Sequence, residues 1–366
     1  MEELFEKHPW IESAMLAISQ EVVKTVPRGL MFRVCLGASL SVLALAADAV
    51  VILGYLKKEE TRVYGHALLA MIAASMTGQL LLVCIQNRRK PRELSMEMLK
   101  VLTGLKPVFD ACAVSSGMKI EDHQMFDAKT ELSIAKGIET VAENIGGCVL
   151  KTYVILRGSD RSGMAVASVL ISALASGWAS ATLSYDFDTD PVRRKESPAF
   201  YGYVPDKKIS RTKLLMCMAL NSASLLLARS LSMSLLLLVK KIYFLMYMSG
   251  DMALYLLYKV AREDFHYWMP VDGVAGLLVS LLMRVGVKLV SDFTGLIHCR
   301  CPQEVGGLYW TVNMFLALLA SFASAFVYHA DTGEELELAA AEIEERAAWT
   351  LVGSLSGVWV RARFGY

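Results

Sequence analysis

The sequence has no excess of charge of either sign. Its 37 lysines and arginines face 36 aspartates and glutamates, which leaves a formal net charge of +1. A chain this balanced has no general attraction for nucleic acid, so we expect no nucleic-acid partner. Residues 1–7 also lack the basic and then apolar order of a cleaved signal peptide, because they are polar and acidic. Insertion into a membrane would then depend on an uncleaved apolar segment further along the chain.

Signatures of the common enzyme classes are absent as well. We find no Gly-rich phosphate-binding loop, no Gly-x-Ser-x-Gly nucleophile elbow and no His-Glu-x-x-His zinc motif. Most of the seven cysteines lie in apolar runs, and the closely spaced Cys299 and Cys301 have no further ligands at the spacing of a metal site. We therefore expect no enzyme, no catalytic residue, no metal and no cofactor.

An acidic trio in the second half of the chain also falls short of a metal site. Asp186, Asp188 and Asp190 alternate like the start of a calcium-binding loop. Pro191 stands where such a loop needs glycine, and Ser197 stands where it needs its closing glutamate. We interpret the trio as part of a solvated loop of mixed charge.

What the sequence does have is long apolar segments. Hydrophobic residues make up 55% of its 366 residues and the mean hydropathy is +0.43, which is too apolar for a soluble domain of this size. A helix that crosses a bilayer needs about 20 apolar residues. The sequence predicts an all-α, polytopic transmembrane helix bundle with about eight membrane segments, over residues 30–56, 64–85, 132–156, 164–183, 214–239, 242–260, 269–297 and 308–328.

Some stretches do not fit a simple lipid-facing span. The apolar stripe over residues 132–156 is interrupted by four charged side chains, Lys136, Glu139, Glu143 and Lys151. We expect this helix to be partly polar or re-entrant and wrapped by its neighbours. Residues 95–120 have a half-apolar helical pattern that favours an interfacial or partly re-entrant helix. Residues 164–183 are small and apolar, which predicts close approach of helix backbones and a central position.

The ends of the chain differ from this bundle. We expect an N-terminal amphipathic segment over residues 1–28, a transmembrane domain over 29–330 and an acidic helical tail over 331–366. The loops that eight passes place on the N-terminal side carry more lysine and arginine than the others. The positive-inside rule therefore predicts an integral, multi-pass membrane protein with both termini in the cytoplasm.

Charged residues inside the apolar segments are the best candidates for a functional site. A charge at the bilayer centre costs about 3 kcal/mol on insertion scales, so such residues persist where they pair, line a wet cavity or act. Arg229 has no partner on its own segment, and we expect its counter-charge to be Asp48 or Asp251. Lys136 is expected to pair locally with Glu139. The predicted intramembrane polar core consists of Asp48, Glu139, Glu143, Arg229, Asp251, Arg284, Lys288 and Asp292.

Two of these segments resemble each other. Asp48 is followed by tyrosines at +7 and +16, and Asp251 is followed by tyrosines at the same two spacings. Each aspartate lies in an apolar helix that ends in a charged turn. Duplicated halves are common in membrane proteins, with the functional site at their interface. An internal repeat is one interpretation of this pattern, and chance similarity between apolar helices is the other.

Residues 47–56 and the later helix over residues 136–151 resemble the XK-related membrane proteins. That family has an acidic residue in its first span and, later, a helix of the type Glu-x-x-Pro-x-x-x-Leu-Gln. The sequence matches this helix at its glutamate and leucine and departs from it at its proline and glutamine. The four corresponding residues are Glu143, Leu150, Gly146 and Lys151.

The resemblance implies an α-helical bundle with internal repeats, membrane-embedded charges and, for some members, phospholipid scrambling. On that analogy Asp48 and Glu143 would line a hydrophilic cleft for lipid headgroups. Four further stretches are similar to a group of algal and protist multi-span membrane proteins. That likeness implies no activity, and it rests on residues 200–205, 250–251, 264–268 and 292–295.

Three functions are therefore open. A charged intramembrane core fits a pathway for lipid headgroups, as in a scramblase, with membrane lipids as the partner. It also fits ion pairs that only fix helix register in a structural or partner-binding membrane protein. Such a protein would dock its partner through residues 185–213 or the acidic tail. Carboxylates at membrane depth also fit an ion-coupled transporter or channel.

Overall fold

The structure is a computed structural model, and all its described elements are helical. It describes residues 28–88, 90–116, 128–190, 194–195, 197–198, 200–205, 207–263, 273–296 and 306–332. Within these ranges there is no strand, so the predicted all-α class is confirmed. The expected amphipathic segment over residues 1–28 and the expected tail over 331–366 lie, except for their innermost residues, outside the described part of the chain.

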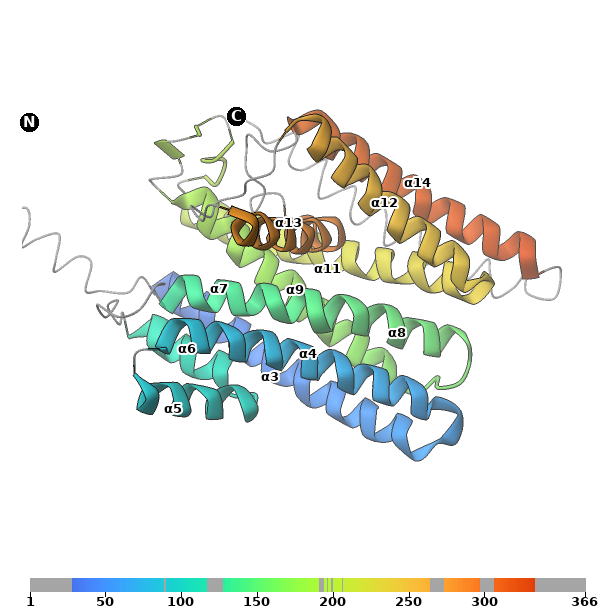
Figure 1. The fold of residues 1–366 in the computed structure, drawn as a ribbon, viewed down its shortest axis with the longest axis horizontal. Coiled ribbons are helices and arrows are strands. Elements are labelled where there is room, and N and C mark those ends of the chain that lie inside the picture. Colours follow the sequence, from blue (N-terminus) through green and yellow to red (C-terminus); the bar gives the residue numbers. More distant parts are fainter. Residues whose placement is uncertain are drawn as a thin grey trace, which may run out of the picture. The chain divides into compact units, whose positions relative to one another are not determined.

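Six of the described helices are long and apolar enough to cross a membrane, namely α3, α4, α9, α11, α13 and α14. The two other expected segments, residues 132–156 and 242–260, are helical but more polar. The sequence estimate of about eight was therefore approximate. The helical elements (Figure 1) are α3 (Arg28–Lys57), η1 (Glu59–Thr61), α4 (Arg62–Asn87), α5 (Pro91–Leu102), α6 (Lys106–Ser115), α7 (Ala128–Glu139), η2 (Thr140–Asn144), α8 (Ile145–Leu156), α9 (Gly163–Thr189), α11 (Lys208–Val239), α12 (Lys241–Ala261), α13 (Gly273–Thr294) and α14 (Gly306–Thr332).

The chain divides into two compact units. The first contains residues 1–42 and 80–134, and the second contains residues 43–79 and 135–366. In the first unit, α5 and α6 form a short hairpin that turns at Gly104, whose positive φ of 70° suits glycine. The second unit holds most of the membrane helices and is built around α11, which packs against α8, α9, α12, α13 and α14.

The closest helix pair in the second unit is α9 with α11. A Cβ atom built on Gly177 of α9 would lie 2.7 Å from the backbone oxygen of Ala219 and 2.8 Å from Ala223, both on α11. The two backbones therefore approach as closely as they do only because position 177 has no side chain. This contact agrees with the central position that the small residues of 164–183 predict.

Gly177→Ala is expected to destabilise the fold by about 1–3 kcal/mol, because the added methyl group overpacks against backbone that cannot move aside alone. Unfolding in mild detergent, followed by fluorescence, measures the change. Gly54→Ala is the matched control, since nothing lies within 4 Å of a Cβ at that helical glycine. Equal stability of the two variants would contradict the close contact.

Candidate functional site

A buried lysine joins three helices in the second unit. Lys151 of α8 is fully buried, and its Nζ donates to Asp48 Oδ1 on α3 at 2.6 Å. It also donates to the hydroxyl oxygens of Ser168 and Ser172, one turn apart on α9, at 3.0 and 2.9 Å. The Ser168 hydroxyl in turn donates to Asp48. The ammonium and the carboxylate are thus neutralised and hydrogen-bonded at membrane depth, which is what a buried pair requires. We call these four residues the Lys151 cluster.

A second lysine has a similar role on the other side of α11. Lys288 of α13 is fully buried, and its Nζ donates to Asp251 Oδ2 on α12 at 2.7 Å and to Asp292 one turn later on α13. Asn313 of α14 donates to the other oxygen of Asp292 at 2.9 Å. The Tyr255 ring lies 5.6 Å from the ammonium. Lys288, Asp251, Asp292 and Asn313 form what we call the Lys288 cluster.

The two clusters share a chemical pattern that the proposed repeat only partly explains. Each places the first aspartate of a repeated segment against a lysine from a later helix. The tyrosines do not follow the same register, however. Tyr55 at +7 is buried, whereas its counterpart Tyr258 is 39% exposed and the buried ring is Tyr255 at +4. The aspartates therefore match in role, and the tyrosines do not.

Arg229 is buried at 3% exposure without a carboxylate partner among the described residues. Its Nη1 lies 3.4 Å from the Tyr247 hydroxyl of α12, and its guanidinium lies 5.8 Å from the Phe293 ring of α13. Within the described part of the chain, its Nε and Nη2 have no hydrogen-bond partner. The expected pairing with Asp48 or Asp251 is wrong, because Lys151 and Lys288 hold those two carboxylates.

Glu139 and Glu143 have different surroundings. Glu139 pairs with Lys136 at 2.8 Å, so the local pair expected from the sequence is confirmed. Glu143 is buried in η2, a single π-helical turn between α7 and α8. Such π-turns occur frequently at functional sites because they rotate side chains out of the α-helical register.

The last predicted core residue, Arg284, is buried on α13 one turn before Lys288. Its Nε lies 3.4 Å from the Ser280 hydroxyl, one turn earlier on the same helix. The structure therefore places several of the predicted residues in the Lys151 and Lys288 clusters. Arg229 lies separately beside aromatic rings, and Glu143 lies separately in the π-turn.

Several residues of these clusters were missed in the sequence. Lys151 stood out only as an interruption of an apolar stripe, although a lysine in such a stripe already signals a buried partner. Ser168 and Ser172 looked like small packing residues, and Asn313 was assigned no role. Serines four apart on one helix face are the signal that could have found the α9 part of the Lys151 cluster.

Two residues of the acidic trio lie in a helix and not in the predicted loop. Helix α9 continues to Thr189, so Asp186 and Asp188 belong to its last turns. Asp188 is 1% exposed, and its carboxylate accepts backbone N–H groups of residues 202, 203 and 204 at 3.0, 3.1 and 2.7 Å. The interpretation as a solvated loop is therefore wrong for Asp188, which fixes the loop after α9 to the helix end.

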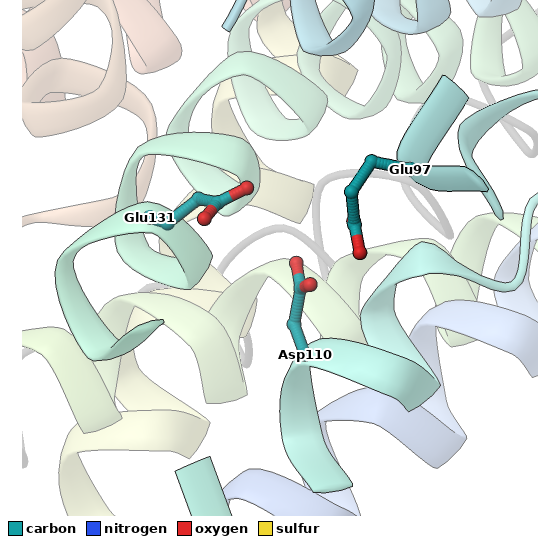
Figure 2. Close-up of side chains that lie close together, drawn as sticks. All are labelled: Glu97, Asp110 and Glu131. Atoms are coloured by element: carbon teal, nitrogen blue, oxygen red, sulfur yellow. The ribbon is translucent and has the colours of Figure 1, made fainter. Parts of the chain in front are cut away.

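The first unit contains a separate ionic cluster at the α5–α6 hairpin. Figure 2 shows the carboxylates of Glu97 (α5), Asp110 (α6) and Glu131 (α7) pointing toward one another, and one oxygen of each lies within 4.8 Å of the others. The Nζ of Lys106, 1% exposed, lies 3.2, 2.9 and 2.8 Å from these three groups. The Lys106 ammonium occupies the position that a bound metal ion would need. We therefore interpret these four residues, called here the Lys106 cluster, as an ion-pair network.

The Lys106 cluster gives a pH dependence with a defined sign. Burial raises the pKa of Asp110 from 3.8 to about 6, against the opposing effect of Lys106. The folded state therefore holds a proton that the unfolded chain has released between about pH 4 and about pH 6, so stability is expected to fall as the pH rises through this window. For Glu97, burial is outweighed by Lys100 and Lys106, which lower its pKa, so its contribution has the opposite sign and is lost as the pH falls from 4.5 through the lowered pKa.

Protease protection of the α5–α6 hairpin in detergent, followed from pH 4 to pH 7, measures this dependence. Asp110→Asn preserves the shape of the side chain and removes the titrating proton, so the slope is expected to disappear. An unchanged slope in that variant would assign the effect to another group.

The fold and these clusters define a class: a multi-pass α-helical membrane protein with charged side chains buried at membrane depth. The family model described as XK-related protein matches residues 32–295, which is well over half of the chain. The protein belongs to the XK-related family, and the resemblance seen in the sequence is confirmed. No curated protein matches the chain.

Proposed function

We propose that the protein passes lipids between the two leaflets by a scramblase-like, passive route along its buried polar groups. The observation that carries this proposal is the burial of charge within a membrane bundle. Asp48, Lys151, Arg229, Lys288 and Asp292 are each at most 3% exposed. Membership of the XK-related family adds support, since its resemblance implies lipid scrambling for some members. The proposal needs no chemical transformation, cofactor or metal.

The chemistry of these groups suits a phospholipid headgroup. A headgroup carries a phosphate and, in many lipids, an ammonium, so it can exchange partners with ion pairs of both signs. Lysine and arginine would donate hydrogen bonds to the phosphate oxygens, and the aspartate carboxylates would accept hydrogen bonds from the ammonium. Each exchange replaces one ionic contact by another and avoids leaving a charge bare in hydrocarbon, which costs about 3 kcal/mol on insertion scales.

Arg229 is the most sensitive place to test this route, because its Nε and Nη2 have no hydrogen-bond partner among the described residues. In liposomes with a fluorescent lipid in both leaflets, dithionite should bleach more than the outer half when the wild-type chain is present. Arg229→Gln is expected to slow this bleaching by about tenfold, the effect of about 1.4 kcal/mol on the barrier.

Lys240→Gln is the matched control, because it removes one positive charge from an exposed position at the end of α11. It should leave the rate unchanged. Bleaching that stops at the outer half with the wild-type chain would refute the scramblase proposal.

A second candidate function follows from the completeness of the lysine clusters. If the ion pairs only fix helix register, the protein has a structural or partner-binding role. Asp188 holds an ordered segment around residues 200–204 that includes Tyr203, 68% exposed, as a docking point within residues 185–213. Pull-downs with Tyr203→Ala, beside the scrambling assay, separate the two roles: a lost partner with unchanged bleaching favours docking.

We also propose that both termini lie in the cytoplasm, as the distribution of lysine and arginine indicates. Protease cleavage of terminal epitope tags in intact and permeabilised cells tests this orientation. Cleavage of either tag in intact cells would contradict it.

A further inference from the structure

The α5–α6 hairpin of the first unit is inverted in polarity relative to a hairpin in water. Three charged side chains near the turn point inward, where Lys106 pairs with Glu97 and Asp110. The large outward side chains near the turn are apolar, from 37% to 59% exposed: Met96, Leu99, Leu102, Leu105, Val108 and Phe109. In water the arrangement would be the opposite, because apolar surface favours burial and charge favours hydration.

The outer stripe of the hairpin also changes in polarity with distance from the turn. Exposed Arg92 and Ser95 begin the stripe on α5, and exposed Ser116 ends it after α6. Between them the large exposed side chains are apolar on both sides of Gly104. Polarity therefore falls toward the tip and rises again toward the base. This is the profile of a hairpin that enters hydrocarbon tip first.

The backbone of the turn is paired without help from water. The N–H groups of Thr103, Gly104 and Leu105 donate to carbonyl groups of residues 99–101 at 3.0, 2.9 and 3.1 Å. The hydroxyl of Thr103, the one exposed polar side chain at the tip in the described structure, donates to the carbonyl of Leu99 at 3.0 Å. Hydrocarbon tolerates only backbone whose polar groups are satisfied within the protein.

The hairpin has the length of one leaflet. Helices α5 and α6 contain 12 and 10 residues, so they are about 18 and 15 Å long. The hydrocarbon core of a bilayer is about 30 Å thick, and each helix therefore reaches about its middle. The basic residues Arg88, Lys90 and Arg92 precede and begin α5, at the level where anionic headgroups attract positive charge.

We propose that the α5–α6 hairpin is a half-depth membrane insertion, with its outer face covered by the acyl chains of one leaflet and its base among the headgroups. The Lys106 cluster makes the insertion tolerable, because it turns the charges of three helices toward one another and away from lipid. This inference does not depend on lipid transport, so the two proposals can fail separately.

Two cysteine variants on one stripe test the depth. Leu102→Cys lies near the tip and Ser95→Cys near the base. The full-length chain that carries either variant is reconstituted in phosphatidylcholine–phosphatidylglycerol liposomes. A polyethylene-glycol maleimide is then added on both sides of the membrane. Maleimide reacts with the hydrated thiolate, so Ser95→Cys should gain one adduct over the parent chain. Leu102→Cys should gain its adduct only after denaturation in SDS. An adduct at position 102 in intact membranes would overturn the proposal.

Labelling with an apolar diazirine dissolved in the bilayer identifies what covers the tip. Adducts on the peptide that contains residues 96–109 are the expected result, since the probe reacts with what the acyl chains touch. A tip protected from maleimide but free of diazirine adducts would show that protein covers it, and this too would overturn the proposal.

Discussion

Lys151→Met is expected to lower the free energy of unfolding by about 3–5 kcal/mol, the cost of breaking a buried ion pair by removing one partner. The methionine fits the space of the lysine stem, but Asp48 would keep its charge at 3% exposure with only serine hydroxyls beside it. Chemical unfolding of the purified protein in mild detergent measures the loss.

The double variant Asp48→Asn with Lys151→Met provides the control for this result. It removes both charges, and replacing a buried pair by neutral groups is often close to neutral in stability. Much of the loss should therefore be recovered, so the effects of the two single substitutions should be far from additive in the double-mutant cycle. Strictly additive effects would mean that Lys151 and Asp48 do not act as a pair.

Lys288→Met is expected to have an effect of at least similar size, because it leaves two carboxylates, Asp251 and Asp292, without their shared ammonium. Asp292 is 2% exposed and would keep only the amide of Asn313 as a donor. The same unfolding measurement applies. We expect a loss of about 3–5 kcal/mol and weaker association of α12 with α13.

Second substitutions should restore the stability of the Lys288→Met variant to different extents. Asp292→Asn removes the more deeply buried of the two carboxylates, so it should recover more stability than Asp251→Asn, whose side chain is 23% exposed. Asn313→Ala alone should cost less than Lys288→Met, because it removes a single hydrogen bond to a charged group, worth about 1.5–3 kcal/mol. The reverse order would contradict the contact geometry.

The helices and the buried charges were predictable, because both follow from local composition. An apolar run of about 20 residues forms a membrane helix almost wherever it occurs, and a charge such as Asp48 or Lys288 inside that run needs a partner. The identity of the partner was not predictable. Asp48 meets Lys151 from 103 residues away, and no local pattern encodes which of several cations the packing brings near.

Local exceptions to regular helix were harder to predict. The π-turn that carries Glu143 arises within a continuous helical pattern, and periodicity alone does not separate it from the α-helix around it. Asp188 looked solvated because its neighbours are polar, yet the loop that returns to it is set by tertiary contacts. The Lys106 cluster was missed for a related reason, since its side chains come from three helices.

The contact at Gly177 also limits how the second unit can move. Where two helix backbones meet directly, no side chains lie between them that could repack while the helices shift. We therefore expect α9 and α11 to stay together as one rigid block. The Lys151 cluster includes α9 on this block, whereas the Lys288 cluster joins only α12, α13 and α14. We therefore expect any rearrangement of the second unit to leave the contact between α9 and α11 intact.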